Sequence, residues 1–173
     1  NPSRLVPLGI KPSYAAESYG YIRRGNRVSA VANQDDDTVF EVQEFCEKPD
    51  QATAQQYLDH GEYYWNSGIF VWRTATIIKA IEENDSALME HINVICNAYE
   101  SPEFEEIFQR EFSAIEGRSI DYTVLETHDK VVVIPTTFEW NDVGSWQSIQ
   151  SLFPVDENNN TIISKHVSVN STN

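Results

Sequence analysis

The stretch that decides the fold class is an apolar run followed by a tryptophan-rich turn: Lys130-Val131-Val132-Val133-Ile134-Pro135, then Trp140-Asn141-Asp142-Val143-Gly144-Ser145-Trp146. The first run predicts a buried strand, and residues 145–153 predict a helix. An acid between a strand and a helix is well placed to hold a metal ion or a ligand. Asp is also a preferred helix cap. The residues alone leave these two interpretations of Asp142 equally supported.

The charge of the chain excludes two classes of partner. The 173 residues carry a formal net charge of -15, which argues against nucleic acid and anionic membranes. The same charge repels phosphorylated ligands, so a phosphate site would need local cations, and Arg23, Arg24, Arg27 and Lys48 are the candidates. The two cysteines, Cys46 and Cys96, have no metal-ligand spacing and are interpreted as reduced core thiols of a cytoplasmic protein.

Strands and helices alternate without a regular parallel βαβ rhythm, which predicts an α/β domain with a mixed sheet. We expect one domain over residues 1–155, then a polar linker and the start of another module over residues 156–173. Phe104, Ile107, Phe108 and Phe112 are predicted to form the buried face of a helix. Strands are predicted over residues 5–10, 27–32, 38–46, 63–72 and 130–134. Helices are predicted over residues 50–58, with Gly61 as the stop, and over residues 86–99 and 145–153. Three more helices are predicted to begin after cap residues at Thr74, Ser101 and Ser119.

Four further segments carry candidate site residues, each with a plain structural alternative. Glu47 and Lys48 suit sugar hydroxyls and a phosphate, or form a salt bridge at the end of a strand. Asn66, in Trp65-Asn66-Ser67-Gly68, suits a vicinal diol, or marks a β-bulge. Asp121 suits a ligand hydroxyl, or reinforces a helix N-terminus, which is the favoured interpretation. Gly20 is placed to present a backbone amide to a ligand.

Taken in order, five segments resemble one family, the sugar-1-phosphate nucleotidylyltransferases, and within it the bacterial mannose-1-phosphate guanylyltransferases. The resemblance covers roughly residues 5–170, and the ordered set is more specific than any single motif. The segments are Gly20-Tyr21-Ile22, Phe45-Cys46-Glu47-Lys48-Pro49, Trp65-Asn66-Ser67-Gly68-Ile69-Phe70, Ser119-Ile120-Asp121-Tyr122 and Trp140-Asn141-Asp142-Val143-Gly144-Ser145-Trp146.

The resemblance implies a three-layer, Rossmann-like α/β nucleotide-diphospho-sugar transferase domain with a mixed sheet. It implies the reaction of GTP with mannose 1-phosphate to give GDP-mannose and pyrophosphate, with Mg²⁺ as cofactor. Asp142 would be the metal ligand, and Asp142 and Lys48 would be the catalytic residues. The implied substrate contacts are Gly20, Glu47, Lys48, Asn66 and Asp121.

The chain departs from the family in one large respect. The family opens its domain with a glycine-rich loop that cradles the nucleotide, and no such pattern occurs here. The resemblance therefore implies a fragment, the sugar-binding C-terminal half of the catalytic domain, which is inactive alone. A divided sheet would expose edge strands, so we expect a homo-oligomer. Another sugar nucleotidylyltransferase, or a non-catalytic sugar-phosphate-binding module, stays an alternative at this point.

Overall fold

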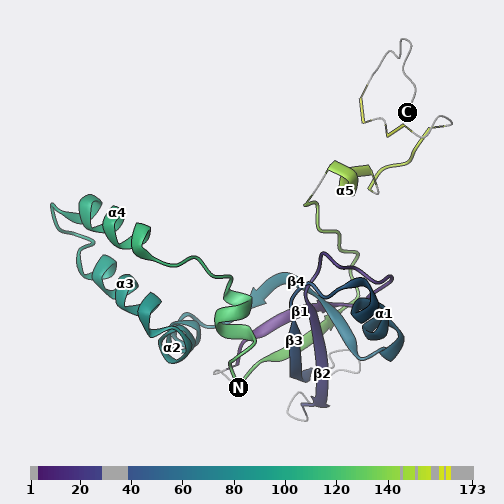
Figure 1. Cartoon of the computed structure of the whole chain (residues 1–173), viewed down its shortest axis with the longest axis horizontal. Coiled ribbons are helices and arrows are strands. Elements are labelled where there is room, and N and C mark those ends of the chain that lie inside the picture. The colour runs from purple at the N-terminus through teal and green to yellow at the C-terminus, as the bar shows by residue number, and fades with distance from the viewer. Residues whose placement is uncertain are drawn as a thin grey trace. The chain divides into compact units, whose positions relative to one another are not determined.

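Five strands in the N-terminal part of the chain form one mixed sheet that closes on itself (Figure 1). Their bounds are β1 Val6–Ile10, β2 Tyr21–Arg27, β3 Phe40–Cys46, β4 Tyr63–Val71 and β5 Val132–Thr136. The order around the barrel is β1-β4-β2-β3-β5, and the pair that closes it, β5 with β1, is the parallel one. The other four pairs are antiparallel, so the predicted mixed sheet is confirmed.

The structure is a computed structural model that describes residues 4–28, 39–144, 146–150, 152–156, 160–161 and 163–164. The chain divides into two compact units, residues 1–137 and 138–173, and each is described by itself. The boundary predicted between residues 155 and 156 falls inside the second unit and stays a prediction. Most of residues 156–173, predicted as a linker and the start of another module, lies outside the described residues.

Closure of the sheet was not predicted. Each of the five described strands has a neighbour on both sides, so none of them presents the open edge that the sequence analysis expected. Edge pairing therefore gives no reason for self-association in this part of the chain, and the homo-oligomer stays a prediction.

None of the helices in the described ranges has the length and apolar character needed to cross a bilayer.

The helices are α1 Gln51–His60, α2 Thr74–Asn84, α3 Ser86–Asn97, α4 Phe104–Ala114, the π-helical turn η1 Asp121–Leu125 and, in the second unit, α5 Trp146–Gln150. The predicted limits of α1 are confirmed. Oδ1 of Asp50 accepts a hydrogen bond from the Thr53 amide at 2.8 Å, and Gly61 ends the helix with a φ of 76°.

The hydrophobic core joins the barrel to two of these helices. It contains Leu5, Ile22, Phe45 and Val133 from the sheet region, together with Ala80 of α2 and Val124 and Leu125 of η1. Five of these seven side chains have no solvent exposure. Burial of such apolar side chains, each worth about 1.5–3 kcal/mol for Val, Leu, Ile or Phe, fixes η1 against the sheet.

Two predicted caps were wrong, and one strand was not predicted. Strand β2 lies at Tyr21–Arg27, where Tyr21 and Ile22 are fully buried between β3 and β4. Of the strand predicted over residues 27–32, residues 29–32 lie outside the described residues, so that strand stays a prediction. Thr74 is the first residue of α2 rather than its cap, a position that Arg73 occupies. Helix α4 begins at Phe104 with Glu103 as its cap, so Ser101 is not the cap either.

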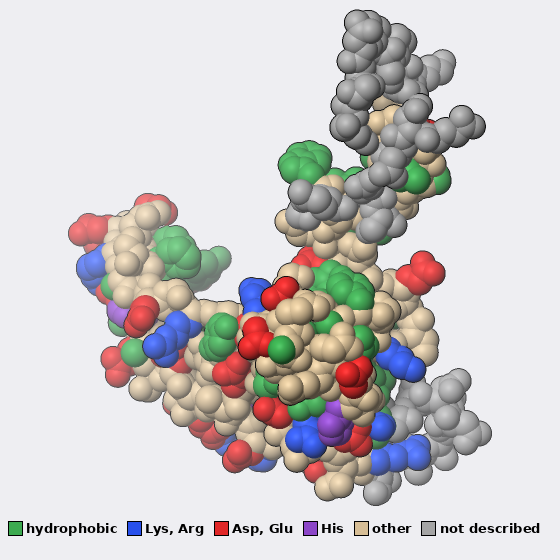
Figure 2. Space-filling model, turned by 45° about the vertical axis from the view of Figure 1, so that its right-hand side comes forward, with side chains coloured by type: hydrophobic (Ala, Val, Ile, Leu, Met, Phe, Trp, Pro, Cys, Tyr) green, Lys and Arg blue, Asp and Glu red, His purple; other side chains and the backbone are tan. Residues whose placement is uncertain are grey.

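The predicted buried face of α4 was also wrong. No residue of α4 is buried, and Phe112 is 62% exposed. Phe104, Phe108 and Phe112 instead form a row of neighbouring rings along the helix, with centroids 5.8 and 5.4 Å apart. Figure 2 shows hydrophobic side chains at the surface of the helical arm that α3 and α4 form. Cys96 of α3 is likewise exposed rather than a core thiol.

The closed barrel makes a prediction about Gly9 of β1. A Cβ atom at this position would lie 2.7 Å from Cγ2 of Val133 and 2.9 Å from Cβ of Tyr64. We expect Gly9→Ala to lower the free energy of unfolding by about 1–3 kcal/mol, because the neighbouring strands must move apart. Urea denaturation followed by circular dichroism measures this.

Gly117→Ala is the matched control, since a Cβ atom there meets nothing within 4 Å. It should change the stability by less than about 0.5 kcal/mol. Equal stability of the Gly9→Ala protein and the wild type would contradict the close approach of the three strands.

Candidate functional site

Three predicted site residues lie in a row at one end of the β3-β2-β4 part of the sheet. Tyr21 pairs with Cys46 on one side and with Trp65 on the other. The residues next to this triplet are therefore neighbours; they are Gly20, Glu47 and Asn66. The backbone N–H of Asn66 donates a hydrogen bond to the backbone carbonyl of Gly20 at 2.8 Å. The register of the sheet alone brings together positions that are 46 residues apart in the sequence.

Gly20 leaves the space that the Glu47 side chain occupies. A Cβ atom at Gly20 would lie 2.5 Å from Oε2 of Glu47 and 3.4 Å from Cβ of Asn66. Its φ is not in the left-handed region, so the close approach of a side chain, rather than backbone conformation, favours glycine here. The Glu47 carboxylate thus lies directly over the backbone at Gly20.

Lys48 pairs with this carboxylate. Its Nζ lies 3.1 Å from Oε1 of Glu47, whose side chain is 12% exposed, whereas that of Lys48 is 63% exposed. The hydrogen bond and the charge of Glu47 raise the pKa of Lys48, and the charge of Asp121 acts in the same direction. Lys48 has a φ of 46°, an uncommon conformation for a non-glycine residue and more so before a proline. The predicted salt bridge at the end of the strand is confirmed, and it leaves an ammonium group facing solvent.

The other cations that the sequence singled out have different partners. The guanidinium of Arg23 lies over the ring of Tyr63 at 5.8 Å, and that of Arg24 lies over Phe40 at 4.7 Å. Arg24 also lies 4.0 Å from Glu62. Lys48, in contrast, forms its ion pair with Glu47.

Asp121 joins the site through side-chain hydrogen bonds. Nδ2 of Asn66 donates to Oδ1 of Asp121 at 3.0 Å, and Oγ of Ser119 donates to its Oδ2 at 2.6 Å. The carbonyl oxygen of Asn66 accepts from the Gly68 amide at 3.1 Å. Both ends of the Asn66 amide are therefore held, and Asp121 has a partner on each oxygen.

The bulge that was weighed for Asn66-Ser67-Gly68 is also present. Pro7 and Gly9 of β1 face Phe70 and Asn66, so β4 carries extra residues between the two pairs. Gly68 has a φ of 71°, and Oγ of Ser67 donates to the Leu8 carbonyl at 2.7 Å. The bulge therefore lies next to the hydrogen bond between Asn66 and Asp121, and the role of Asn66 in a ligand site stays a prediction.

Glu126 is a nearby acid that the sequence analysis missed. The π-helical turn is closed by a hydrogen bond of 2.9 Å from the Glu126 amide to the Asp121 carbonyl. Partial burial, and then the negative charges of Glu47 and Asp121, raise the pKa of Glu126. In an α-helix two residues five positions apart lie about 140° apart around the axis, so helical periodicity gave no signal for this pairing.

Asp142 lies in the second unit, and its side chain is exposed. Helix α5 begins at Trp146, and Val143 and Gly144, which follow Asp142 directly, are not helical. The interpretation of Asp142 as the cap residue of this helix is therefore wrong. Its role as a metal ligand stays a prediction, since no group of three His, Cys, Asp or Glu side chains suited to a metal occurs among the described residues.

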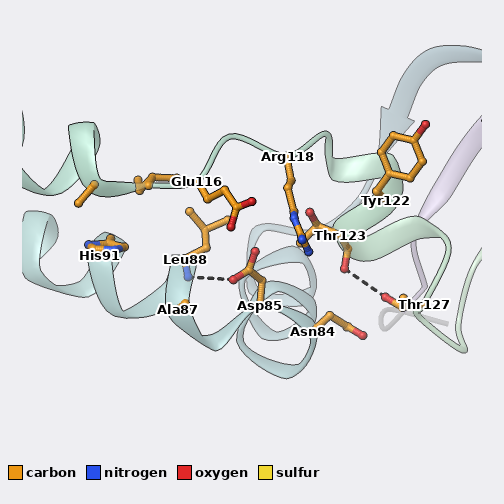
Figure 3. Close-up of a pocket in the computed structure, with 12 residues that line it drawn as sticks. Asn84, Asp85, Ala87, Leu88, His91, Glu116, Arg118, Tyr122, Thr123 and Thr127 are labelled. Atoms are coloured by element: carbon orange, nitrogen blue, oxygen red, sulfur yellow. Dashed lines mark hydrogen bonds between the residues drawn. The ribbon is translucent and has the colours of Figure 1, made fainter.

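A pocket of 530 Å³ lies on another side of η1 (Figure 3). Its walls come from the ends of α2 and α4, the start of α3 and the turn η1 itself. Arg118 projects into it beside Asp85, and Tyr122 and Thr123 of η1 also line it. Sequence reasoning missed this pocket because its lining residues are brought together by the packing of four separate elements.

The arrangement around Glu47 suits a polar ligand that carries an anion. The neighbouring side chains offer two carboxylates, from Glu47 and Asp121, and one amide, from Asn66. Hydrogen-bonding groups of these kinds suit the hydroxyl groups of a sugar. Lys48 adds an exposed point charge that suits a phosphate. A nucleotidyl transferase family matches residues 2–159 of the chain.

The chain belongs to the nucleotidyl transferase family. It is 38% identical to the mannose-1-phosphate guanylyltransferase of Salmonella montevideo over 98% of this chain and 36% of the relative. It is 37% identical to the xanthan biosynthesis protein XanB of Xanthomonas campestris pv. campestris (strain B100) over 91% of this chain and 32% of the relative. The chain thus spans about a third of the length of these curated relatives.

The fold agrees with the family. The crystal structure of mannose-1-phosphate geranyltransferase from Thermus thermophilus matches 90% of this chain and 42% of its own, with a TM-score of 0.71 and 29% identity. The predicted fold class, a partial α/β nucleotidyltransferase domain with a mixed sheet, is therefore confirmed.

The link between Asn66 and Asp121 in this nucleotidyl transferase domain is testable without a ligand. We expect a double-mutant cycle of Asn66→Ala and Asp121→Ala to give a coupling energy of about 1–2 kcal/mol in urea denaturation, because their hydrogen bond involves a carboxylate. The control cycle pairs Asp121→Ala with Asp59→Ala; Asp59 accepts a hydrogen bond from Gln55 within α1. That cycle should show coupling below about 0.5 kcal/mol. Equal coupling in both cycles would contradict a direct Asn66–Asp121 contact.

Proposed function

We propose that the chain is part of a mannose-1-phosphate guanylyltransferase and supplies its sugar-phosphate site. The reaction joins the guanylyl group of GTP to mannose 1-phosphate, with release of pyrophosphate. The observation that carries the proposal is the convergence of Gly20, Glu47, Asn66 and Asp121 through the contacts described above, with Lys48 beside them. The names of the relatives support the choice of mannose 1-phosphate and of the guanylyl group.

The roles follow from the chemistry of each group. Glu47, Asn66 and Asp121 would bind the hydroxyl groups of mannose, and Lys48 would bind the phosphate. The phosphate oxygen then attacks the α-phosphorus of GTP in line, and pyrophosphate leaves. Such a transfer asks for little covalent help from the protein, so positioning and charge neutralisation are the contributions of these side chains.

The chain alone is proposed to be inactive. It spans about a third of the length of its curated relatives, and its sequence contains no glycine-rich phosphate loop. The GTP site would therefore belong to a part of the protein outside these residues. A cytoplasmic location and a homo-oligomer are proposed with the same enzyme and stay predictions.

Mg²⁺ fits the proposal through Asp142. Proteins bind this ion with one or two carboxylates, and substrate phosphates and water complete its ligands. Asp142 offers one exposed carboxylate in a segment where the chain leads into α5. When bound, the ion would neutralise the phosphates of the nucleotide, while Lys48 acts on the phosphate of the sugar.

Gly20→Ala tests the sugar-phosphate site in the 173-residue chain. The added methyl group displaces the end of the flexible Glu47 side chain, so the stability should change by less than about 0.5 kcal/mol. Because the carboxylate leaves its position, we expect binding of mannose 1-phosphate to weaken about 10- to 100-fold, the equivalent of one charged hydrogen bond. Isothermal titration calorimetry measures the affinity.

Gly25→Ala, on the strand that follows Gly20, is the matched control, since a Cβ atom there lies 3.4 Å from its nearest neighbour, the Glu41 carbonyl oxygen. It should bind as the wild type does. Unchanged binding by the Gly20→Ala protein, or no binding by the wild type, would count against the site.

Asp142→Asn tests the metal ligand in the full-length protein. We expect a loss of about 3 kcal/mol of transition-state stabilisation, seen as a lower kcat and a higher Mg²⁺ requirement in a pyrophosphate-release assay with GTP and mannose 1-phosphate. Asn141→Asp, with Asp142 intact, controls for the charge of the segment. A normal kcat and Mg²⁺ dependence in the Asp142→Asn enzyme would remove Asp142 from the metal site, and turnover by the isolated chain would refute its inactivity.

A further inference from the structure

The pocket on the other side of η1 is separate from the proposed sugar-phosphate site. Its volume is 530 Å³, a size that accommodates a small-molecule ligand. None of the residues assigned to the sugar-phosphate site lines this pocket; those residues are Gly20, Glu47, Lys48, Asn66 and Asp121. The pocket therefore has no part in the function proposed so far.

Opposite charges line this pocket without pairing. Arg118 projects into it, and the carboxylates of Asp85 and Glu116 point toward the same space (Figure 3). Arg118 and Glu116 have no hydrogen bond or ion pair with any residue that the structure describes. One carboxylate oxygen of Asp85 accepts a hydrogen bond from the Leu88 amide at 2.9 Å, which leaves its other oxygen available. The guanidinium and the two carboxylates can therefore all bind a ligand.

The polar groups of the pocket match a sugar that carries a phosphate group. The guanidinium of Arg118 offers paired donors to phosphate oxygens, and the carboxylates accept hydrogen bonds from hydroxyl groups. Leu88 and Ile115 add apolar surface for the carbon atoms of a sugar ring. Bare phosphate suits the pocket less well, because it would meet two carboxylates beside one arginine and has no sugar hydroxyls to offer them.

Ser119 links the pocket to the sugar-phosphate site. It directly follows Arg118, and its Oγ donates a hydrogen bond to Oδ2 of Asp121 at 2.6 Å. Its carbonyl oxygen accepts hydrogen bonds from Oγ1 and from the backbone N–H of Thr123, both at 3.1 Å. Thr123 itself lines the pocket. A ligand on Arg118 and Thr123 therefore holds the segment from which Ser119 reaches Asp121.

The hydrogen bond between Ser119 and Asp121 is exposed, so water competes for both groups in the free protein. A ligand that holds residues 118–123 favours the formed hydrogen bond over the open one. The formed bond orders the carboxylate that Asn66 also contacts, at 3.0 Å. Because that order is already present, a second ligand binds to Asp121 at a lower entropic cost. The coupling of the two sites acts equally in both directions.

We propose that this pocket binds a sugar that carries a phosphate group, and that this ligand strengthens the binding of mannose 1-phosphate through Ser119. The first part stands on the pocket alone, and the second part rests on the proposed function. Arg118 binds the phosphate, and Asp85 and Glu116 bind hydroxyl groups of the sugar.

The probe for the pocket is glucose 6-phosphate, titrated into the ¹⁵N-labelled 173-residue chain and followed by NMR. We expect the backbone amide signals of Leu88, Arg118 and Thr123 to shift and to reach saturation. Glucose lacks the group that Arg118 binds, and inorganic phosphate lacks the sugar hydroxyls. Each should therefore bind at least about tenfold more weakly than glucose 6-phosphate. Absence of shifts at these three amides would overturn the pocket as a ligand site.

Variants of Arg118 locate the phosphate. Arg118→Gln should weaken the binding of glucose 6-phosphate about 10- to 100-fold, and Arg118→Lys, which keeps the charge but not the paired donors, should recover part of this loss. Arg73→Gln is the matched control, because it removes the same charge from an exposed residue that does not line the pocket. Equal binding by Arg118→Gln and the wild type, or shifts confined to Gly20 and Asn66, would overturn the pocket while leaving the proposed function intact.

Calorimetry with mannose 1-phosphate, with and without saturating glucose 6-phosphate, measures the coupling. We expect mannose 1-phosphate to bind about five- to tenfold more tightly when the pocket is filled. Ser119→Ala should remove this gain, while the amides of Leu88 and Arg118 still respond to glucose 6-phosphate. Unchanged or weaker binding of mannose 1-phosphate would overturn the coupling. No binding of mannose 1-phosphate, together with normal shifts in the pocket, would contradict the proposed function and leave the pocket as a ligand site.

Discussion

The position of Tyr21 between β3 and β4 is the constraint on which the site depends. Its side chain is fully buried, its backbone pairs with both Cys46 and Trp65, and its hydroxyl accepts a hydrogen bond from the Ala16 amide at 2.9 Å. A shift of one residue in either pairing would turn every side chain of β2 to the opposite face. The burial of one aromatic ring therefore sets the register that aligns Gly20, Glu47 and Asn66.

The second support of the site comes from the core on the side of η1. Val124 and Leu125 are packed against the sheet, while Asp121 at the start of the same turn reaches Asn66. One short element thus has an apolar end that anchors it and a polar end that completes the site. Because the turn is π-helical, its closing hydrogen bond joins the backbone amide of Glu126 to the Asp121 carbonyl.

Local signals predicted some elements well and others poorly. Asp50 and Gly61 marked the ends of α1 because capping is decided within one turn of the chain. The aromatic stripe of α4 correctly predicted a helix, but not its burial, since periodicity describes one face of a helix and not what covers it. The strand at Tyr21–Arg27 was not predicted, because its residues alternate poorly and its pairing partners lie far along the chain.

The sequence by itself determined the family, the mixed α/β class and the residue types of the site, because ordered motifs and local periodicity are written along the chain. Only the tertiary structure decided that Gly20 makes room for Glu47 and that Asn66 meets Asp121. It also decided that the sheet closes into a barrel. The physical reason is the same in each case: these contacts join residues that are distant in sequence, and strand register, a bulge and a π turn set them through backbone geometry that residue types alone do not specify.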